Sequence, residues 1–247
     1  MLLSCAVAPT GRFLTAEWRW LAMANFAVDP ALLLPRLPAG LELDLFEGVA
    51  MVSLVGFHFL DTRVLGVAVP FHRNFDEVNL RFYVRRRVDD GWRRGVVFVT
   101  ELVPRWALAA VARVAYGEPY SAVPMEHFLA DGGRRIEYRW RCSASWCALG
   151  METGPAWRAP APGSEMAFIT EHFWGYSGRP GRRTREYQVE HPPWRVRAAE
   201  RVTTSGDLAS VYGRELGEAL ARPARSAFLA EGSEVTVRRP EVVALQQ

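Results

Sequence analysis

Four polar side chains stand at every second position of residues 75–84, in a pattern that could bind and transform a small molecule. They are a carboxylate, an amide, a guanidinium and a phenol: Glu77, Asn79, Arg81 and Tyr83. Side chains alternate between the two faces of a strand, so in an extended segment all four share one face, about 6.7 Å apart. A guanidinium can bind a carboxylate through two hydrogen bonds, and a glutamate can act as a general acid or base. Glu77 and Arg81 could therefore flank one small substrate.

The positions between these polar residues are apolar, which predicts a strand with one face in the protein core. They are Val78, Leu80, Phe82 and Val84. Alternation alone favours solvent for the polar face, because one face of an antiparallel sheet is often solvated. Asparagine has a low β-propensity, which argues slightly against a plain exposed strand. Whether the polar row lines a cavity or faces water stays open at this point.

Five histidines add further candidate groups: His58, His72, His127, His172 and His191. None of them shows a zinc-binding spacing, so we predict no metal site. His172 follows Glu171 in an aromatic-rich segment and is a candidate proton-transfer group, although a packed core histidine is the commoner outcome. His72 directly precedes the polar strand and is a candidate for substrate binding at a cavity mouth. Nucleophile-elbow, P-loop and dinucleotide-binding motifs are absent from the sequence, so we predict no cofactor.

The composition excludes one large class of chemistry. The chain has 247 residues, of which 49% are hydrophobic and 23% charged, as in ordinary globular proteins. All 30 basic residues are arginine and none is lysine. Arginine stays protonated, so the chain has no side-chain amine that could form a Schiff base or act as a neutral base.

Charge, cysteine content and hydropathy indicate the partners and the compartment. The net charge is only +3 and the arginine pairs are scattered, so we expect no nucleic-acid partner. The three cysteines, Cys5, Cys142 and Cys147, predict reduced thiols in a cytoplasmic protein. The longest apolar stretch, residues 49–60, is shorter than the about 20 residues that cross a bilayer, so no membrane association is expected. The sequence leaves open whether copies of the chain form homo-oligomers.

Hydrophobic patterns predict strands at residues 15–26, 41–46, 49–60, 75–88, 94–103, 134–142, 184–189, 195–202 and 234–238. Asp89-Asp90-Gly91 predicts the tight turn of a hairpin. Helices are predicted at residues 104–116, 164–175 and 207–221, with a short one after Asp29-Pro30. The whole chain, residues 1–247, is therefore expected to form one α+β domain made mainly of antiparallel strands.

Several segments of the sequence resemble a known family. They run in order along the chain and comprise residues 20–30, 75–84, 95–98, 170–176 and 187–194. Together they resemble the YqjF-like family of uncharacterised bacterial proteins (domain of unknown function 2071), over roughly residues 15–238. The resemblance implies a fold similar to acetoacetate decarboxylase: a barrel or cone of strands with flanking helices and a central cavity.

The resemblance also implies site residues. The strand with Glu77 looks like the decarboxylase strand that places a glutamate in the cavity. Residues 115–120, Ala-Tyr-Gly-Glu-Pro-Tyr, look like the decarboxylase segment that carries the Schiff-base lysine, and Tyr120 stands at the lysine position. A phenol cannot form an imine, but Tyr120 could donate a hydrogen bond or a proton, or simply pack. Glu118, in the same segment, is a second candidate acid or base.

Two functions follow from these observations. The first is an enzyme that acts on a small carbonyl or carboxylate compound by acid–base chemistry without a Schiff-base lysine. The second is a non-catalytic module that kept the cavity and binds an anionic or carbonyl-containing ligand. Loss of the lysine favours the module, whereas the row of Glu77, Asn79 and Arg81 favours the enzyme.

Overall fold

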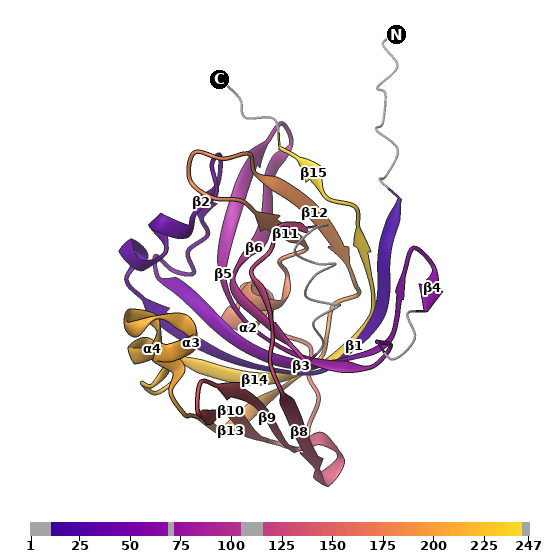
Figure 1. Ribbon diagram of the computed structural model, residues 1–247, viewed down its shortest axis with the longest axis vertical. Coiled ribbons are helices and arrows are strands. Elements are labelled where there is room, and N and C mark those ends of the chain that lie inside the picture. The colour runs from indigo at the N-terminus through magenta and orange to yellow at the C-terminus, as the bar shows by residue number, and fades with distance from the viewer. Residues whose placement is uncertain (1–10, 69–71, 105–115, 244–247) are drawn as a thin grey trace.

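A long sheet that curls until its ends meet forms most of the molecule (Figure 1). The computed structural model describes residues 11–68, 72–104 and 116–243. Around the ring the strands follow the order β12 (Arg185–Glu190), β11 (Trp174–Ser177), β6 (Gly91–Val103), β5 (Phe75–Val88), β3 (Ala50–Val64), β1 (Arg12–Val28) and β14 (Ser226–Arg238). Pairing of β12 with β14 closes the ring. Neighbours in the ring are antiparallel except β11 and β6, which are parallel.

A second group of strands extends from β14 and lies beneath the ring in Figure 1. In order from β14 these strands are β13 (Val196–Ser205), β10 (Ser145–Thr153), β9 (Arg135–Cys142) and β8 (Met125–Ala130). Four short strands pair with ring strands: β2 (Glu42–Leu43) with β5, β4 (Val67–Ala68) with β3, β7 (Tyr120–Ala122) with β6 and β15 (Glu241–Val242) with β12. The mainly antiparallel α+β class predicted from the sequence is confirmed.

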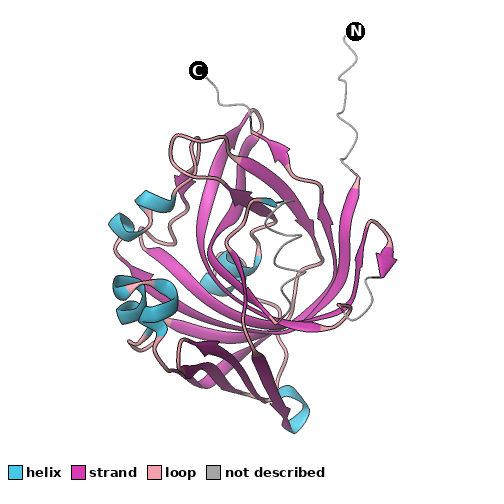
Figure 2. Ribbon diagram, viewed as in Figure 1, coloured by secondary structure: helices cyan, strands magenta, loops and turns pink. Residues whose placement is uncertain are grey.

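Helices are few and short (Figure 2). The α-helices among the described residues are α2 (Glu165–Thr170), α3 (Leu208–Tyr212) and α4 (Arg214–Leu220). Three 3₁₀ turns accompany them: η1 (Pro30–Leu32), η2 (Leu34–Arg36) and η3 (Asp131–Gly133). No helix in this described part of the chain has the length and apolar character needed to cross a bilayer.

Strand β5 separates two hydrophobic cores. Its even-numbered residues, such as Leu80 and Phe82, pack with the second sheet and with α3 and α4 outside the ring. Phe75 and Tyr83, at odd-numbered positions, belong to the core inside the ring, together with Phe168 of α2. Both faces of β5 are therefore buried, and the solvent-facing interpretation of its polar row is wrong. The second sheet, α3 and α4 cover the apolar face of β5, which alternation predicts to be its only buried face. The opposite, polar face is buried inside the ring.

Several predicted elements keep their place but change their length. The strand at residues 75–88 and its hairpin turn are confirmed. The predicted helix at residues 164–175 ends at Thr170, because Trp174 already pairs with β6. The predicted helix at residues 207–221 is broken into α3 and α4 at Gly213, whose φ of 84° lies in the left-handed region. The predicted helix at residues 104–116 falls almost wholly outside the described residues.

The cysteines differ from the expectation of reduced thiols. Cys142 and Cys147 form a disulfide between β9 and β10. They stand near the turn of an antiparallel hairpin, where Cys142 pairs with Ser145 and Cys147 with Trp140. The prediction of reduced thiols rested on the small number of cysteines. That number carries no information about whether a hairpin brings two of them together, so the prediction fails for Cys142 and Cys147. Cys5 lies outside the described residues.

Candidate active site in the central cavity

The ring encloses a cavity of about 170 Å³. A cavity of this size is comparable to one that admits benzene, so the ligand it fits is a small molecule. The wall is predominantly aromatic and aliphatic, with residues from β1, β3, β5, β6, β11, β12 and α2. Polar side chains gather on the part of the wall formed by β5, β6 and β7. An apolar cavity with a few convergent polar groups is the usual form of a small-molecule site.

Three of the four polar residues predicted on β5 line this cavity: Glu77, Asn79 and Arg81. The amide of Asn79 donates a hydrogen bond to Glu77 Oε1 at 2.9 Å, which fixes the carboxylate against the strand. Tyr83 shares the face but not the cavity. Its hydroxyl lies 2.5 Å from Ser53 Oγ, and its ring packs on Phe168 of α2, so its interactions support the wall.

Two further glutamates join Glu77 at the cavity, and all three are almost completely buried. Glu101 lies on β6 opposite Asn79, and Tyr120 of β7 pairs with Glu101 on its other side. Glu118 lies two residues before the start of β7 and accepts a short hydrogen bond from the Tyr187 hydroxyl of β12. The Tyr120 hydroxyl donates to Glu77 Oε2 at 3.3 Å. The register of three neighbouring strands thus gathers carboxyl and phenol groups from four segments.

The burial of these carboxyl groups changes their acidity. Burial raises the pKa of Glu77 to about 7, against hydrogen bonds from Asn79 and Tyr120 that lower it. Burial, with some repulsion from Glu77, raises the pKa of Glu118 to about 8. The pKa of Glu101 is raised well above its usual range by burial and by the other two carboxylates. Burial therefore favours the protonated form of these carboxyl groups at a pH where an exposed glutamate is ionised.

Arg81 brings the cavity its positive charge. Its side chain is half-buried, and its guanidinium lies 5.9 Å from the centre of the Tyr83 ring. Among the described residues no carboxylate forms a salt bridge with it, and its buried Nε has no hydrogen-bond partner. Asn79 Oδ1 and Glu101 Oε2 also lack partners among the described residues. Buried polar atoms normally have partners, so these atoms are suited to a polar ligand.

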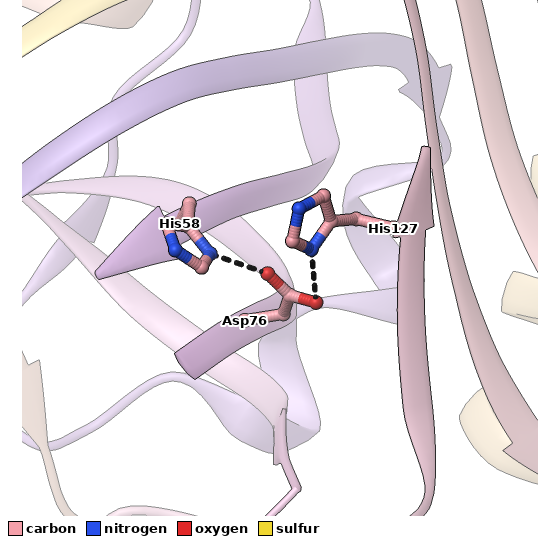
Figure 3. A group of neighbouring side chains, drawn as sticks. All are labelled: His58, Asp76 and His127. Atoms are coloured by element: carbon pink, nitrogen blue, oxygen red, sulfur yellow. Dashed lines mark hydrogen bonds and ion pairs between the residues drawn. The ribbon is translucent and has the colours of Figure 1, made fainter. Parts of the chain in front are cut away.

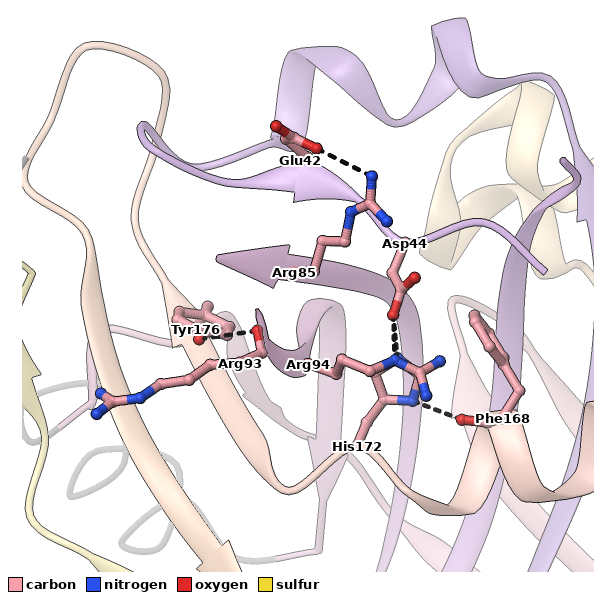
Figure 4. Close-up of polar contacts among 8 residues, drawn as sticks. All are labelled: Glu42, Asp44, Arg85, Arg93, Arg94, Phe168, His172 and Tyr176. Carbon is pink, nitrogen blue, oxygen red and sulfur yellow. Dashed lines mark hydrogen bonds and ion pairs between the residues drawn. The ribbon is translucent and has the colours of Figure 1, made fainter. Parts of the chain in front are cut away.

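The predicted candidate His172 lies in the cavity wall, but its ring nitrogens face away to other groups (Figure 4). Nδ1 lies 2.6 Å from the Phe168 carbonyl oxygen, and Nε2 lies 3.1 Å from Asp44 Oδ2. Burial lowers the pKa of His172 to about 4, so the ring is neutral and donates from one nitrogen only. His172 belongs to the segment between α2 and β11 and not to a helix as predicted. Its contacts suit a positioning role.

The same network holds Asp44. Arg94 Nε donates to Asp44 Oδ2 at 2.6 Å, and the Arg94 guanidinium lies 4.7 Å from the centre of the Phe168 ring (Figure 4). The hydrogen bonds from His172 and Arg94 outweigh burial and lower the pKa of Asp44. The network ties the β2 region, β6 and α2 together behind the cavity wall.

His72, a predicted candidate, lines the cavity. Glu101 and Tyr187, which were not among the predicted site residues, line it too, as does His191. A signal for Glu101 existed, because it is a lone carboxylate in an apolar strand. Its place opposite Asn79 depends on a register shift between Leu80 and Arg81, which counting back from the hairpin turn does not reveal. No comparable signal marks Tyr187, because β12 meets the cavity only through the closure of the ring.

Among the described residues, one group has the composition of a metal site: His58, Asp76 and His127. It lies on the opposite face of β5 from Glu77, outside the cavity lining. The prediction of no metal site rested on local spacing, which gives no information about side chains that separate strands bring together.

Comparison with known proteins gives a consistent result. The domain of unknown function 2071 family, described as an uncharacterized conserved protein, matches residues 15–234. The uncharacterized protein YqjF of Bacillus subtilis (strain 168) is 26% identical over 207 residues, which are 81% of this chain and 82% of YqjF.

Two solved structures show the same fold at low sequence identity. Acetoacetate decarboxylase from Legionella pneumophila subsp. pneumophila str. Philadelphia 1 superposes with a TM-score of 0.69 at 14% identity, covering 99% of this chain and 92% of the decarboxylase. The enduracididine biosynthesis enzyme MppR, complexed with pyruvate, gives a TM-score of 0.66 at 13% identity, covering 98% of this chain and 93% of MppR. The fold predicted from the resemblance is confirmed.

Proposed function

Because the chain belongs to the domain of unknown function 2071 family and has an acetoacetate decarboxylase-like fold, we propose that its cavity binds a small carbonyl-containing carboxylic acid and transfers a proton on it. The observation that carries this proposal is the cluster of three buried glutamates on a predominantly apolar cavity. Buried carboxyl groups without bound cations are costly, and such groups concentrate at functional sites.

Arg81 supports the choice of an acidic ligand. A guanidinium that has no salt bridge to a described carboxylate can bind a ligand carboxylate through two parallel hydrogen bonds. Glu77 stands four residues away on the same face of β5, so the Cα atoms are about 13 Å apart. Their side chains can therefore hold the two ends of one small molecule. The volume of about 170 Å³ limits that molecule to roughly the size of a short-chain oxo acid.

The proton transfer proceeds on the carbon next to the carbonyl group. Glu77, with a pKa of about 7, is partly ionised at neutral pH and takes the proton from this carbon. The electron pair of the broken C–H bond forms a C=C bond to the carbonyl carbon, and the π pair of the C=O bond moves to the oxygen. Glu118, protonated at neutral pH because its pKa is about 8, gives its proton to that oxygen. The product is the enol, and the reverse sequence returns the keto form.

The chain achieves this without a covalent intermediate. By its resemblance to the decarboxylases, Tyr120 stands where they have the Schiff-base lysine, and the sequence contains no lysine at all. Tyr120 donates to Glu77 and so helps to set the acidity of the base. Support for the ligand class comes from MppR, which has the same fold and was crystallised with pyruvate, a small oxo acid.

The experiment is hydrogen–deuterium exchange on a panel of short oxo acids in D₂O, followed by NMR. We expect the wild-type protein to accelerate exchange at the carbon next to the carbonyl for at least one acid. Glu77→Gln should lower this exchange by about 100-fold or more, since it removes the base, while ligand binding by thermal shift persists. Glu126→Gln, an exposed substitution on β8, is the control and should leave exchange unchanged.

The same experiment distinguishes the proposed enzyme from the alternative function, a non-catalytic binding module. Tyr120, at the position of the decarboxylase lysine, favours this alternative. A module would bind an oxo acid, and exchange would stay at the uncatalysed rate in both proteins. Absence of both binding and exchange across the panel would rule out the proposed ligand class.

A further inference from the structure

Three residues from three separate strands meet on the outer side of β5 (Figure 3). His58 comes from β3, Asp76 from β5 and His127 from β8. His58 Nδ1 lies 2.6 Å from Asp76 Oδ1, and His127 Nδ1 lies 2.9 Å from Asp76 Oδ2. The two imidazole rings are tilted against each other with their centres 4.9 Å apart. The carboxylate thus lies between two imidazoles that approach it from different parts of the fold.

We propose that His58, Asp76 and His127 form a binding site for one divalent transition-metal ion. Two imidazole nitrogens and one carboxylate oxygen are a donor set that suits zinc, iron, cobalt and nickel, and not magnesium or calcium, which prefer oxygen ligands only. The same set on one side of an ion, with the remaining positions open, is a recurrent arrangement in metalloproteins.

The separations of the candidate ligand atoms bring them within reach of one ion. Metal–nitrogen and metal–oxygen bonds of about 2.0–2.2 Å place neighbouring ligand atoms about 3 Å apart. The candidate ligand atoms all lie within 4.8 Å of one another, and the two nitrogen–oxygen separations are 2.6 and 2.9 Å. A small rotation of one ring brings all three into coordination range. His127 can make this movement, because its side chain is 41% exposed.

Two of the three side chains of this site are largely buried, and the third is exposed to solvent. The Asp76 side chain is only 9% exposed and the His58 side chain 21%, so the ring of strands holds both. The exposed His127 leaves room on the solvent side for water ligands. A bound ion would join the ring to β8, the outermost strand of the second sheet. Metal binding should therefore also stabilise the packing of that sheet on the ring.

A purely structural role for the cluster makes a different prediction. As an ion-pair network, the three residues would satisfy one another through hydrogen bonds and would show no affinity for added metal. The two roles are therefore separated by metal binding itself, with no assay of the cavity.

The test uses the full chain without an affinity tag, stripped of metal with EDTA and then dialysed. Isothermal titration with ZnCl₂ should show one ion per chain, and CoCl₂ should produce visible d–d absorption bands. At 100 times Kd the ion should raise Tm by roughly 5–10 °C. MgCl₂ and CaCl₂ should give neither heat nor stabilisation.

Asp76→Asn and His127→Gln should each weaken zinc binding at least about tenfold and abolish the cobalt bands. Asp76→Asn keeps the size of the side chain, and the exposed position of His127 makes its variant the safer one for folding, which circular dichroism verifies. Glu126→Gln, the neighbour of His127 on β8, is the matched control and should bind as the wild type does.

Two results would overturn the proposal. One is a zinc Kd weaker than about 100 µM in the wild-type chain. The other is unchanged one-to-one binding in the Asp76→Asn/His127→Gln double variant, which would assign the ion to other residues.

Discussion

At the scale of single residues, the cavity contains two kinds of charged group. Its glutamates have raised pKa values, and its arginine, Arg81, forms no salt bridge with a described carboxylate. Burial raises the pKa values of Glu77, Glu101 and Glu118, and repulsion from neighbouring carboxylates adds to the rise for Glu101 and Glu118. Arg81 faces the same space and lowers the pKa of Glu77. A ligand carboxylate on Arg81 would weaken this influence. The proton affinity of Glu77 should therefore rise slightly when an acid binds.

Arg81→Gln should reduce affinity for a monocarboxylate by about 10–100-fold, because a charge-assisted hydrogen bond is lost. Affinity for the uncharged amide of the same compound should change little. Titration calorimetry with both ligands measures the difference. Arg87→Gln removes an equal charge from an exposed position of the same strand and is the control. Equal losses for acid and amide would show that Arg81 shapes the wall and does not pair with the carboxylate.

At the scale of elements, the second sheet packs very close to the ring where β9 lies against β3. A Cβ atom built on Gly56 of β3 would lie 2.5 Å from Tyr138 Cδ2 of β9. Tyr138 is fully buried, and its hydroxyl donates to the Trp20 carbonyl oxygen at 2.8 Å. Tyr138 therefore cannot rotate away from Gly56 without losing its hydrogen bond to Trp20.

Gly56→Ala should lower the free energy of unfolding by about 1–3 kcal/mol, the usual cost of overpacking a core. Chemical denaturation measures this change. Gly11→Ala, at a position with open space, is the control and should be nearly neutral. Because the added methyl group points to the outer core, ligand affinity of the cavity should persist. A neutral Gly56→Ala would mean that the two sheets adjust more freely than their contact indicates.

The elements also show how far the sequence could predict the structure. The 75–88 strand was predicted to its ends, since its alternation is regular and its turn is distinctive. Strand β10 carries no clear alternation through Ala148, Leu149 and Gly150, so no strand was predicted there. The start of the helix predicted at residues 164–175 is correct, and Ser164 Oγ caps it by accepting a hydrogen bond from Ala167 N. The pairing of Trp174 with β6 ends the helix early. Long-range pairing of this kind leaves no local signal.

At the scale of the whole molecule, the buried carboxyl groups make stability depend on pH. The folded pKa of Glu77 is about 7 and that of Glu118 about 8, whereas both are near 4.5 when unfolded. Between these values the unfolded chain has released protons that the folded chain still holds, so stability falls as pH rises. His172 and His191, whose pKa values are lowered, oppose this trend below pH 6.5.

Glu118→Gln isolates the carboxyl contribution. Between about pH 5 and 8 the variant should lose stability less steeply than the wild type, by up to about 1.4 kcal/mol per pH unit. Urea denaturation across this range gives both curves. The exposed Glu126→Gln should run parallel to the wild type. Parallel curves for Glu118→Gln as well would mean that Glu118 is ionised in the folded protein at neutral pH.

The two buried faces of β5 have a consequence for how this chain can evolve. Deletion of a single residue at the start of β5 would exchange the faces of the residues that follow it in the strand, sending the carboxylate and the guanidinium into the outer core and the valines into the cavity. The chemistry and the fold would be lost in the same event. Descendants of this chain can therefore acquire new ligands by replacing side chains one at a time, while insertions and deletions are tolerated only in the loops between strands.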